Sequence, residues 1–266
     1  MMAEYEKVIK DDISLHYEDQ GVGHAIVLLH GFCGSHEYWK YVIDELEDRY
    51  RIIAVDLRGH GDSAVAENEF TIEDMADDVK VLLESLEIEE ATVIGHSLGG
   101  YVALQLAKNN PALINGLGLV HSTPHSDNEE AKEGREKGKR RILDEGMENF
   151  LDDLVPKLFS PENLETHKGE VEFTKVLGLK TKPQGAIGAL NAMKNRRDMI
   201  PFLKDYQGKL LLVAGENDQI IPKEKTFVKE GNHVTKRLLE DSGHMSMLEE
   251  PKQLIETIRD FIKSLD

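Results

Sequence analysis

The sequence holds one serine in a setting typical of nucleophilic chemistry. Ser97 lies within the motif Gly-His-Ser-Leu-Gly-Gly at residues 95–100, directly after an aliphatic stretch (91–94) and before a helical one (101–108). Such a strand-to-helix turn holds the serine in a strained conformation with its hydroxyl exposed, and glycines two positions to either side permit the close turn. The N–H dipoles at the helix start favour negative charge near this hydroxyl. We therefore predict Ser97 as a nucleophile.

A serine hydroxyl is a weak nucleophile at neutral pH and needs a base, which in turn needs an orienting acid. Where a serine sits on this kind of turn, the chain order is serine, acid, histidine. Of the 11 histidines, only His233 and His244 follow the aliphatic stretch 210–214. His233 precedes an expected strand, at the wrong end of a sheet, whereas His244 follows that strand. We predict His244 as the base.

The acid is expected in the loop that follows the aliphatic stretch 210–214. Asp218 and Glu216 compete there, and we predict Asp218, with Glu216 as the alternative. The other place for an acid, directly after the stretch 114–120, begins with His121 and offers no carboxylate.

An acyl-transfer site also needs two N–H groups aimed where negative charge develops. One is expected from the backbone of Leu98, immediately after the nucleophile. The other is expected from Phe32, which follows the turn at Gly31. Together with the serine, acid and histidine these groups require no metal and no organic cofactor.

The elements that position these residues alternate along the chain. Continuous aliphatic runs indicate strands buried on both faces, and strands alternating with helices imply a mostly parallel sheet covered on both sides. Thr71 begins a capping box ahead of one amphipathic helix, and Pro251 fits the first turn of the last one. The predicted strands are residues 8–9, 13–17, 25–29, 51–55, 91–94, 114–120, 210–214 and 234–239.

One segment breaks the alternation, because residues 121–197 are helical in pattern and contain no convincing strand. We predict a core of residues 1–120 and 198–266, with 121–197 inserted as a helical cap, or lid, over the carboxyl edge of the sheet, where such sheets bind ligands. The basic run 134–140 has the wrong spacing for a phosphate loop and is expected to be a solvated helix face. Arg196 and Arg197 are expected to pair with carboxylates, with a substrate carboxylate as the alternative. Candidate pocket residues are His121, Phe150, Leu154, Phe159 and Met245.

Composition excludes some classes of function. The 266 residues carry a formal charge of −18, and the first 120 hold 23 acidic against 8 basic side chains, so nucleic-acid binding is not expected. The single cysteine, Cys33, cannot form an internal disulfide. No apolar run is long enough to span a membrane, and residues 1–7 do not form a signal sequence. We expect a cytoplasmic protein without membrane or nucleic-acid partners; the sequence leaves its oligomeric state open.

Five motifs in this order resemble the α/β-hydrolase superfamily over nearly the whole chain. They are the Leu-Leu-His-Gly-Phe motif at 28–32, the Asp-Leu-Arg-Gly-His-Gly-Asp-Ser turn at 56–63, the nucleophile turn at 95–100, the acid loop at 215–222 and the histidine loop at 242–244. The sequence is similar to the small lidded group that contains enol-lactonases, carboxylesterases, perhydrolases and meta-cleavage C–C hydrolases. The resemblance implies an α/β-hydrolase fold, with a mostly parallel eight-stranded sheet, helices on both faces and a helical lid.

The function expected from these residues is serine-dependent cleavage of a small carboxylic ester, lactone or thioester through an acyl-enzyme. C–C bond hydrolysis and perhydrolysis use the same three residues and remain alternatives. A non-catalytic small-molecule sensor or partner regulator that keeps the triad is an alternative of another class.

Overall fold

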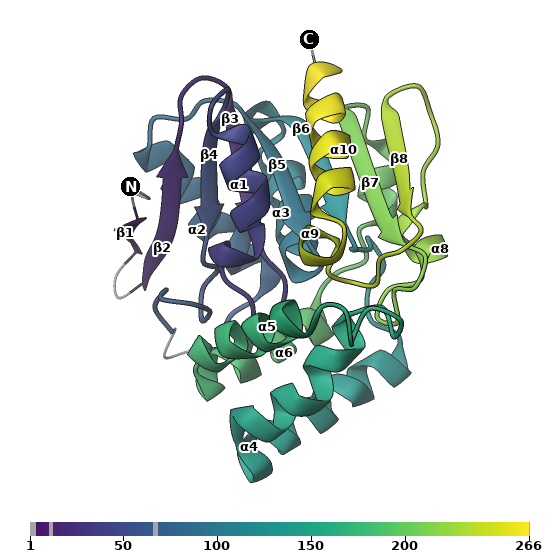
Figure 1. Cartoon of the computed structure of the whole chain (residues 1–266). Coiled ribbons are helices and arrows are strands. Elements are labelled where there is room, and N and C mark those ends of the chain that lie inside the picture. The colour runs from purple at the N-terminus through teal and green to yellow at the C-terminus, as the bar shows by residue number, and fades with distance from the viewer. Residues whose placement is uncertain (1–3, 11–12, 66–68, 266) are drawn as a thin grey trace.

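The computed structural model describes residues 4–10, 13–65 and 69–265, and its centre is one eight-stranded sheet (Figure 1). The strands follow the order β1-β2-β4-β3-β5-β6-β7-β8. From β4 onward in that order neighbouring strands are parallel, and β2 pairs antiparallel with both β1 and β4. The strands are β1 (Glu4–Lys10), β2 (Ile13–Gln20), β3 (Ala25–Leu29), β4 (Arg51–Val55), β5 (Ala91–His96), β6 (Ile114–Val120), β7 (Lys209–Gly215) and β8 (Val234–Leu239).

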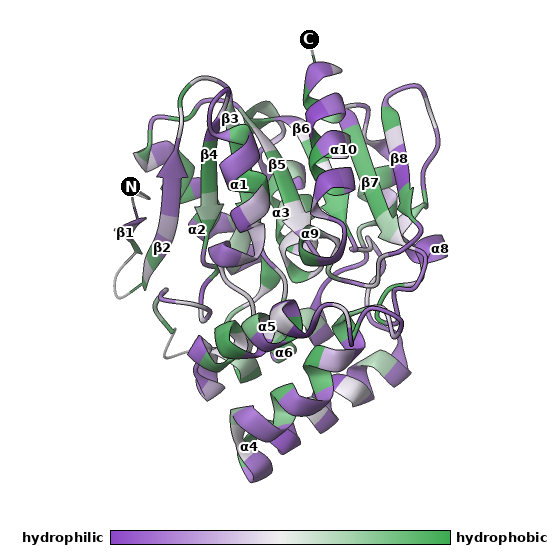
Figure 2. Cartoon of the chain, in the orientation of Figure 1, coloured by the Kyte–Doolittle hydropathy of each residue, from purple (hydrophilic) through white to green (hydrophobic). Residues whose placement is uncertain are grey.

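The mostly parallel sheet predicted from the aliphatic runs is confirmed. All five residues of β3 are buried, as are nearly all of β4 to β7, whereas β8 at the edge alternates between half-buried and exposed positions. Figure 2 shows the same contrast as green central strands beside a mixed β8. Residues 11 and 12, in the expected turn of the opening hairpin, lie outside the described residues, as do residues 1–3 of the N-terminal segment.

Helices cover both faces of the sheet. α1 and α10 contact each other on one face, and α2 and α3 contact each other on the other (Figure 1). Thr71 caps the amino end of α2: its side chain accepts from the Asp74 N–H while the Asp74 carboxylate accepts from the Thr71 N–H, so the predicted capping box is present. The α-helices outside residues 121–197 are α1 (Lys40–Leu46), α2 (Ile72–Ser85), α3 (Leu98–Asn109), α7 (Ile200–Asp205), α8 (Lys223–Thr226), α9 (Ser246–Glu249) and α10 (Pro251–Lys263).

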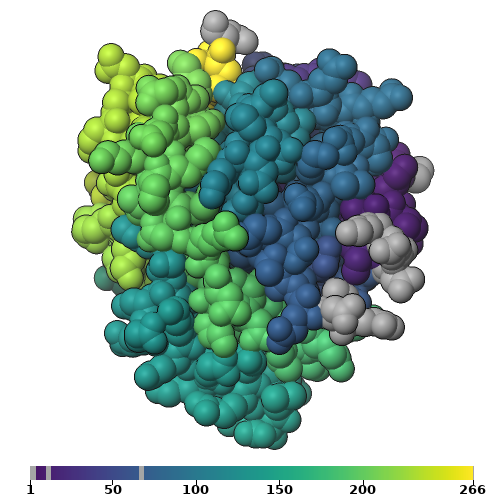
Figure 3. All heavy atoms as spheres, turned by 180° about the vertical axis from the view of Figure 1, so that it is seen from behind, coloured from purple at the N-terminus to yellow at the C-terminus, as the bar shows by residue number. Residues whose placement is uncertain are grey.

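The segment 121–197, called the helical insert below, packs beneath the carboxyl ends of the strands (Figure 1). It contains α4 (Glu129–Leu158), α5 (Lys168–Lys180) and α6 (Pro183–Asn195), and α4 kinks at Gly146, whose φ of 83° interrupts the helix. Seen from behind, the teal and green atoms of the insert form the lower part of the molecule (Figure 3). The segments at the two ends of the insert lie side by side, and the Met199 N–H donates to the Pro124 carbonyl at 2.7 Å. The division into core and cap stays a prediction.

Within the described part of the chain, no helix combines the length and apolar character that crossing a bilayer requires.

Candidate active site

Ser97 occupies a strained turn between β5 and α3. Its φ of 50° and ψ of −112° lie in a region that side-chain-bearing residues rarely adopt. Gly99 permits the turn, since a Cβ there would lie 2.3 Å from the Leu29 carbonyl oxygen. The turn is held by the Ser97 N–H, which donates to the Val120 carbonyl at 3.0 Å. The structure therefore has the sharp strand-to-helix turn that the glycine spacing predicts.

The loop after β3 lies against this turn. A Cβ on Gly31 would sit only 3.3 Å from the Ser97 Cβ, so the two loops touch at the serine. Phe32 follows Gly31 and lines the same cavity as Ser97. Leu98 is the first residue of α3, and its N–H has no acceptor within the helix. Both predicted oxyanion residues are therefore beside the serine.

His244 lies in the loop after β8, and its ring is fixed by a buried carboxylate. Its Nδ1 donates to Oδ2 of Asp218 at 2.8 Å. Its backbone N–H donates to the Leu158 carbonyl at 2.7 Å, so the end of α4 holds this loop from the side of the insert. With Nδ1 engaged, Nε2 is the ring nitrogen left to accept a proton.

Asp218 is buried and accepts four hydrogen bonds. The N–H groups of Ile220 and Ile221 donate to Oδ1 at 2.8 and 2.9 Å, and the rings of His244 and His121 both donate to Oδ2. Burial alone would raise the pKa of Asp218, but the nearby imidazoles and their hydrogen bonds outweigh it and hold the pKa well below its usual range. The carboxylate therefore stays ionised at neutral pH.

The serine and histidine open onto one cavity of about 360 Å³ between the sheet and the helical insert. This volume lies near the lower end of the roughly 300–1,000 Å³ that is usual for small-molecule sites. Its walls combine apolar side chains with a group of charged ones. The residues around it are Phe32, Tyr38, His96, Ser97, Tyr101, Thr123, His125, Ser126, Asp127, Asn128, Ala131, Arg135, Leu154, Leu158, Met193, Arg196, Ile220, Ile221, Lys225, His244 and Met245.

Comparison with known proteins identifies the family, because the sequence profile of the alpha/beta hydrolase fold matches residues 24–162. The chain belongs to this family. A thermophilic esterase from Thermogutta terrifontis, solved with malate bound, is 29% identical with a TM-score of 0.93, and the match covers 99% of each chain. The resemblance inferred from the five motifs is thus confirmed at the level of the fold family.

Two curated relatives are named for different activities, one as a hydrolase and one as an acetyltransferase component. The 2-(acetamidomethylene)succinate hydrolase of Mesorhizobium japonicum is 28% identical over 79% of this chain and 76% of its own length. The dihydrolipoyllysine-residue acetyltransferase component of the acetoin cleaving system of Cupriavidus necator is 32% identical over 93% of this chain. The chain spans 66% of the length of that acetyltransferase component.

The pocket residues predicted from the sequence of this α/β hydrolase take different places. Leu154 and Met245 line the cavity, whereas Phe150, Phe159 and His121 are not among its lining residues. Phe150 meets the ring of Phe32 edge-on at 6.1 Å between centroids, and so lies behind a lining residue. Phe159 is fully buried in the hydrophobic core, and its backbone packs on the histidine loop, where a Cβ on Gly243 would lie 2.6 Å from the Phe159 carbonyl carbon.

His121 has a role in the geometry that the sequence reasoning missed. It is fully buried with a φ of 47°, its Nδ1 donates to Asp218 at 3.1 Å, and its Nε2 accepts from the Ser246 hydroxyl at 2.7 Å. Burial lowers its pKa, which favours the neutral ring that this pattern needs. The available signal was its position directly after β6, the strand that pairs with β7, which the Asp218 loop follows.

The competing acid and base candidates lie elsewhere. Glu216 is exposed, and its carboxylate accepts from the Lys223 ammonium at 2.7 Å. His233 precedes β8 at its amino end, whereas His244 follows the carboxyl end of the same strand. His96 is buried, and its Nε2 donates to the His244 carbonyl at 2.9 Å, so it supports the backbone of the histidine loop.

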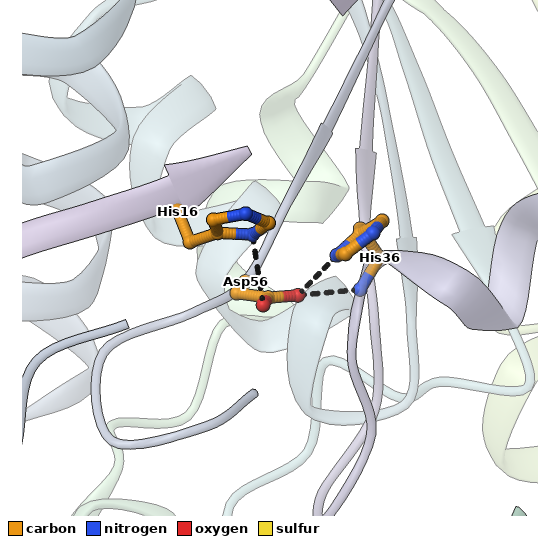
Figure 4. Close-up of side chains that lie close together, drawn as sticks. All are labelled: His16, His36 and Asp56. Carbon is orange, nitrogen blue, oxygen red and sulfur yellow. Dashed lines mark hydrogen bonds and ion pairs between the residues drawn. The ribbon is translucent and has the colours of Figure 1, made fainter. Parts of the chain in front are cut away.

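A second histidine–carboxylate cluster, outside the residues that line the cavity, lies beside the loop that carries Phe32. Asp56 is fully buried between the rings of His16 and His36 (Figure 4). Its Oδ1 accepts from the backbone N–H and Nδ1 of His36 at 2.6 and 2.8 Å, and its Oδ2 accepts from the Asp62 N–H at 2.9 Å. Asp56 therefore ties its own turn to the loop that carries Phe32.

Among the described residues, two groups of three have ligand-type atoms close enough to share a metal ion. They are His16 with His36 and Asp56, and His121 with Asp218 and His244. In each group the imidazole nitrogens already face the carboxylate at 2.8–3.3 Å, as hydrogen-bonded or ion-paired partners. These contacts account for the clustering, and we assign no metal to either group.

Proposed function

We propose that this α/β hydrolase cleaves a carboxylic ester, lactone or thioester of a small molecule, with Ser97 as nucleophile, His244 as base and Asp218 as the orienting acid. The observation that carries the proposal is that Ser97, on its strained turn, and His244, held by Asp218, face one cavity. The esterase from Thermogutta terrifontis, 29% identical over nearly the whole chain, adds support from a relative.

In the first half of the reaction the Ser97 Oγ attacks the acyl carbonyl carbon while His244 Nε2 takes the hydroxyl proton. The N–H groups of Phe32 and Leu98 stabilise the oxyanion as the tetrahedral intermediate forms. The carbon–oxygen bond of the ester then breaks, and the alcohol leaves with the proton from His244. Asp218 keeps the imidazole in the right tautomer and stabilises its charged form.

In the second half, water attacks the acyl-enzyme and gives its proton to His244. The second tetrahedral intermediate releases the carboxylic acid and restores the Ser97 hydroxyl. The substrate enters as a small molecule, which matches the modest volume of the cavity.

Hydrolysis of p-nitrophenyl esters from acetyl to octanoyl by the intact protein and by Ser97→Ala tests this function. If the intact protein turns over short esters and Ser97→Ala does not, the result supports Ser97 as the nucleophile. Equal activity in both proteins contradicts the role of Ser97. If neither protein is active, ester hydrolysis is wrong, and C–C hydrolysis, perhydrolysis and ligand sensing, which use the same constellation, become the next functions to measure.

A further inference from the structure

The active-site cavity concentrates positive charge in an acidic protein. Its ionic lining residues are Arg135, Arg196, Lys225 and a single carboxylate, Asp127, which leaves two positive charges in excess. The chain as a whole carries −18. Solubility accounts for an acidic surface but not for cations gathered in the cavity that Ser97 also lines.

One buried carboxylate organises both arginines. Asp127 accepts from Nη1 of Arg196 at 2.6 Å on one oxygen and from Nε of Arg135 at 3.0 Å on the other. Burial would raise the pKa of Asp127, but the two guanidinium groups outweigh burial and lower it. Asp127 can neutralise only one of these cations, so the second guanidinium has no compensating charge from this carboxylate.

Arg196 is already committed to the protein. Besides Asp127 it donates to the carbonyls of Met193 and His125, and its guanidinium lies 4.1 Å from the centroid of the Tyr101 ring. Tyr101 is one turn along α3 from Ser97, and its N–H donates to the Ser97 carbonyl. These contacts place Arg196 against the first turn of α3, the helix that Ser97 caps, and Asp127 links Arg196 to Arg135.

Arg135 is the uncommitted member of the pair. Its Nε donates to Asp127, and among the described residues its two terminal amino groups make no hydrogen bond. Its side chain is 26% exposed and lines the cavity, so this residue departs from the solvated helix face expected for residues 134–140. The Arg135 guanidinium is oriented through its Nε, and its two terminal amino groups can donate in parallel to the two oxygens of a carboxylate.

We propose that the substrate carries a carboxylate in addition to its scissile ester, and that Arg135 binds this carboxylate with the charge of Lys225 assisting. The inference rests on the proposed function and names its substrate class: half-esters of short dicarboxylic acids. A cavity of about 360 Å³ fits a molecule of that size. An incoming carboxylate supplies the negative charge that the arginine pair lacks, and hydrogen bonds between a guanidinium and a carboxylate are stronger than neutral ones.

The test compares monomethyl glutarate with methyl valerate, which has the same acyl chain without the second carboxylate. Initial rates of methanol release give the ratio of kcat/KM for the two esters. We expect the intact protein to favour the anionic ester at least tenfold, and Arg135→Gln to lower the ratio by about 10- to 100-fold. Arg135→Lys, which keeps the charge without the fork, should lie between. Arg140→Gln, an exposed arginine of α4 outside the cavity, should leave the ratio unchanged.

Two outcomes separate this inference from the proposed function. Ser97-dependent hydrolysis of methyl valerate, with no preference for the anionic ester and no effect of Arg135→Gln on the ratio, overturns the inference and leaves the hydrolase function standing. If neither ester is cleaved, the binding of glutarate to the Ser97→Ala variant, measured by calorimetry, decides whether the anion site exists. Binding that is lost in the Ser97→Ala, Arg135→Gln double variant supports the anion site without the reaction, and absent or Arg135-independent binding overturns it.

Discussion

His121 and His244 donate to the same oxygen, Oδ2 of Asp218, at 3.1 and 2.8 Å. The two rings lie 5.6 Å apart between centroids and come from loops that follow different strands, β6 and β8. His121 is too deeply buried to reach the cavity and is held on its other side by Ser246. We infer that it acts through Asp218, by sharing the negative charge that would otherwise fall on His244 alone.

Substitution His121→Ala should therefore change the pH dependence of activity. With one donor fewer, the Asp218 carboxylate accepts more strongly from His244 and stabilises its charged, inactive form. We expect the acid limb of the kcat/KM profile to move to higher pH by roughly half to one unit, which corresponds to about 0.7–1.4 kcal/mol. The measurement is the profile of p-nitrophenyl butyrate hydrolysis between pH 5 and 9.

His121→Asn is the matched rescue variant. The amide nitrogen of asparagine occupies much the same place as Nδ1, and asparagine tolerates the φ of 47° found here. The asparagine profile should return toward that of the intact protein. An alanine variant with lower activity but an unshifted acid limb would show that His121 serves only the packing of its loop.

The acid of the proposed triad can be identified by two amide substitutions. Asp218→Asn should reduce kcat by about three to four orders of magnitude, because an amide cannot fix the productive tautomer of His244. Glu216→Gln should change kcat less than twofold, since Glu216 is exposed and paired with Lys223. The opposite pattern would assign the acid to Glu216. Circular dichroism of both variants checks that the fold is retained.

The nucleophile turn should be intolerant of a single methyl group. In Gly99→Ala the new Cβ would meet the Leu29 carbonyl oxygen at 2.3 Å, so β3 and α3 must separate. We expect a loss of at least about 2 kcal/mol in the free energy of unfolding, measured in urea. Gly134→Ala on α4 is the control, because no atom lies within 4 Å of its added Cβ and helix propensity predicts a gain of about 0.5–1 kcal/mol.

The cluster around Asp56 should make stability depend on pH. Burial lowers the pKa of His36, but the hydrogen bond and charge of Asp56 outweigh burial and raise it; for His16 the Asp56 hydrogen bond is the leading cause of a raised pKa. A histidine whose pKa is raised on folding contributes its full stabilisation below its unfolded pKa of about 6.5. That contribution is lost as the pH rises through the folded-state value.

His36→Asn tests this relationship, because the amide still donates to Asp56 but cannot be protonated. At pH 5.5 the melting temperature of the intact protein should be higher than that of the variant. This difference in melting temperature should become smaller toward pH 9. A hydrogen bond to a charged group is worth about 1.5–3 kcal/mol, which sets the largest expected difference. His167→Gln is the control, because His167 is a partly exposed histidine of the insert whose ring pairs with the Thr166 hydroxyl rather than with a carboxylate. A difference in melting temperature that does not change with pH would show that the charge of His36 does not contribute to stability.

The sequence by itself determined the features that depend on neighbouring residues. The bounds predicted for β3, β4, β6 and β8 match those of the structure, because continuous or alternating apolar runs between turn residues specify a strand locally. The cap at Thr71 and the turn at Ser97 were equally readable, since both depend on side chains and glycines within a few positions. The ordered motifs then gave the family.

The tertiary structure alone decided which distant residues meet. His121 and Asp218 are 97 residues apart, and they touch because β6 and β7 are neighbours in the sheet. Arg135 faces the cavity because of the way α4 packs beneath the strands, although its local sequence is that of a solvated helix face. Phe159 has the apolar character of a pocket residue, yet its side chain packs in the hydrophobic core and does not line the cavity. Local periodicity shows which side of an element is apolar, but only the packing of elements sets what that side contacts.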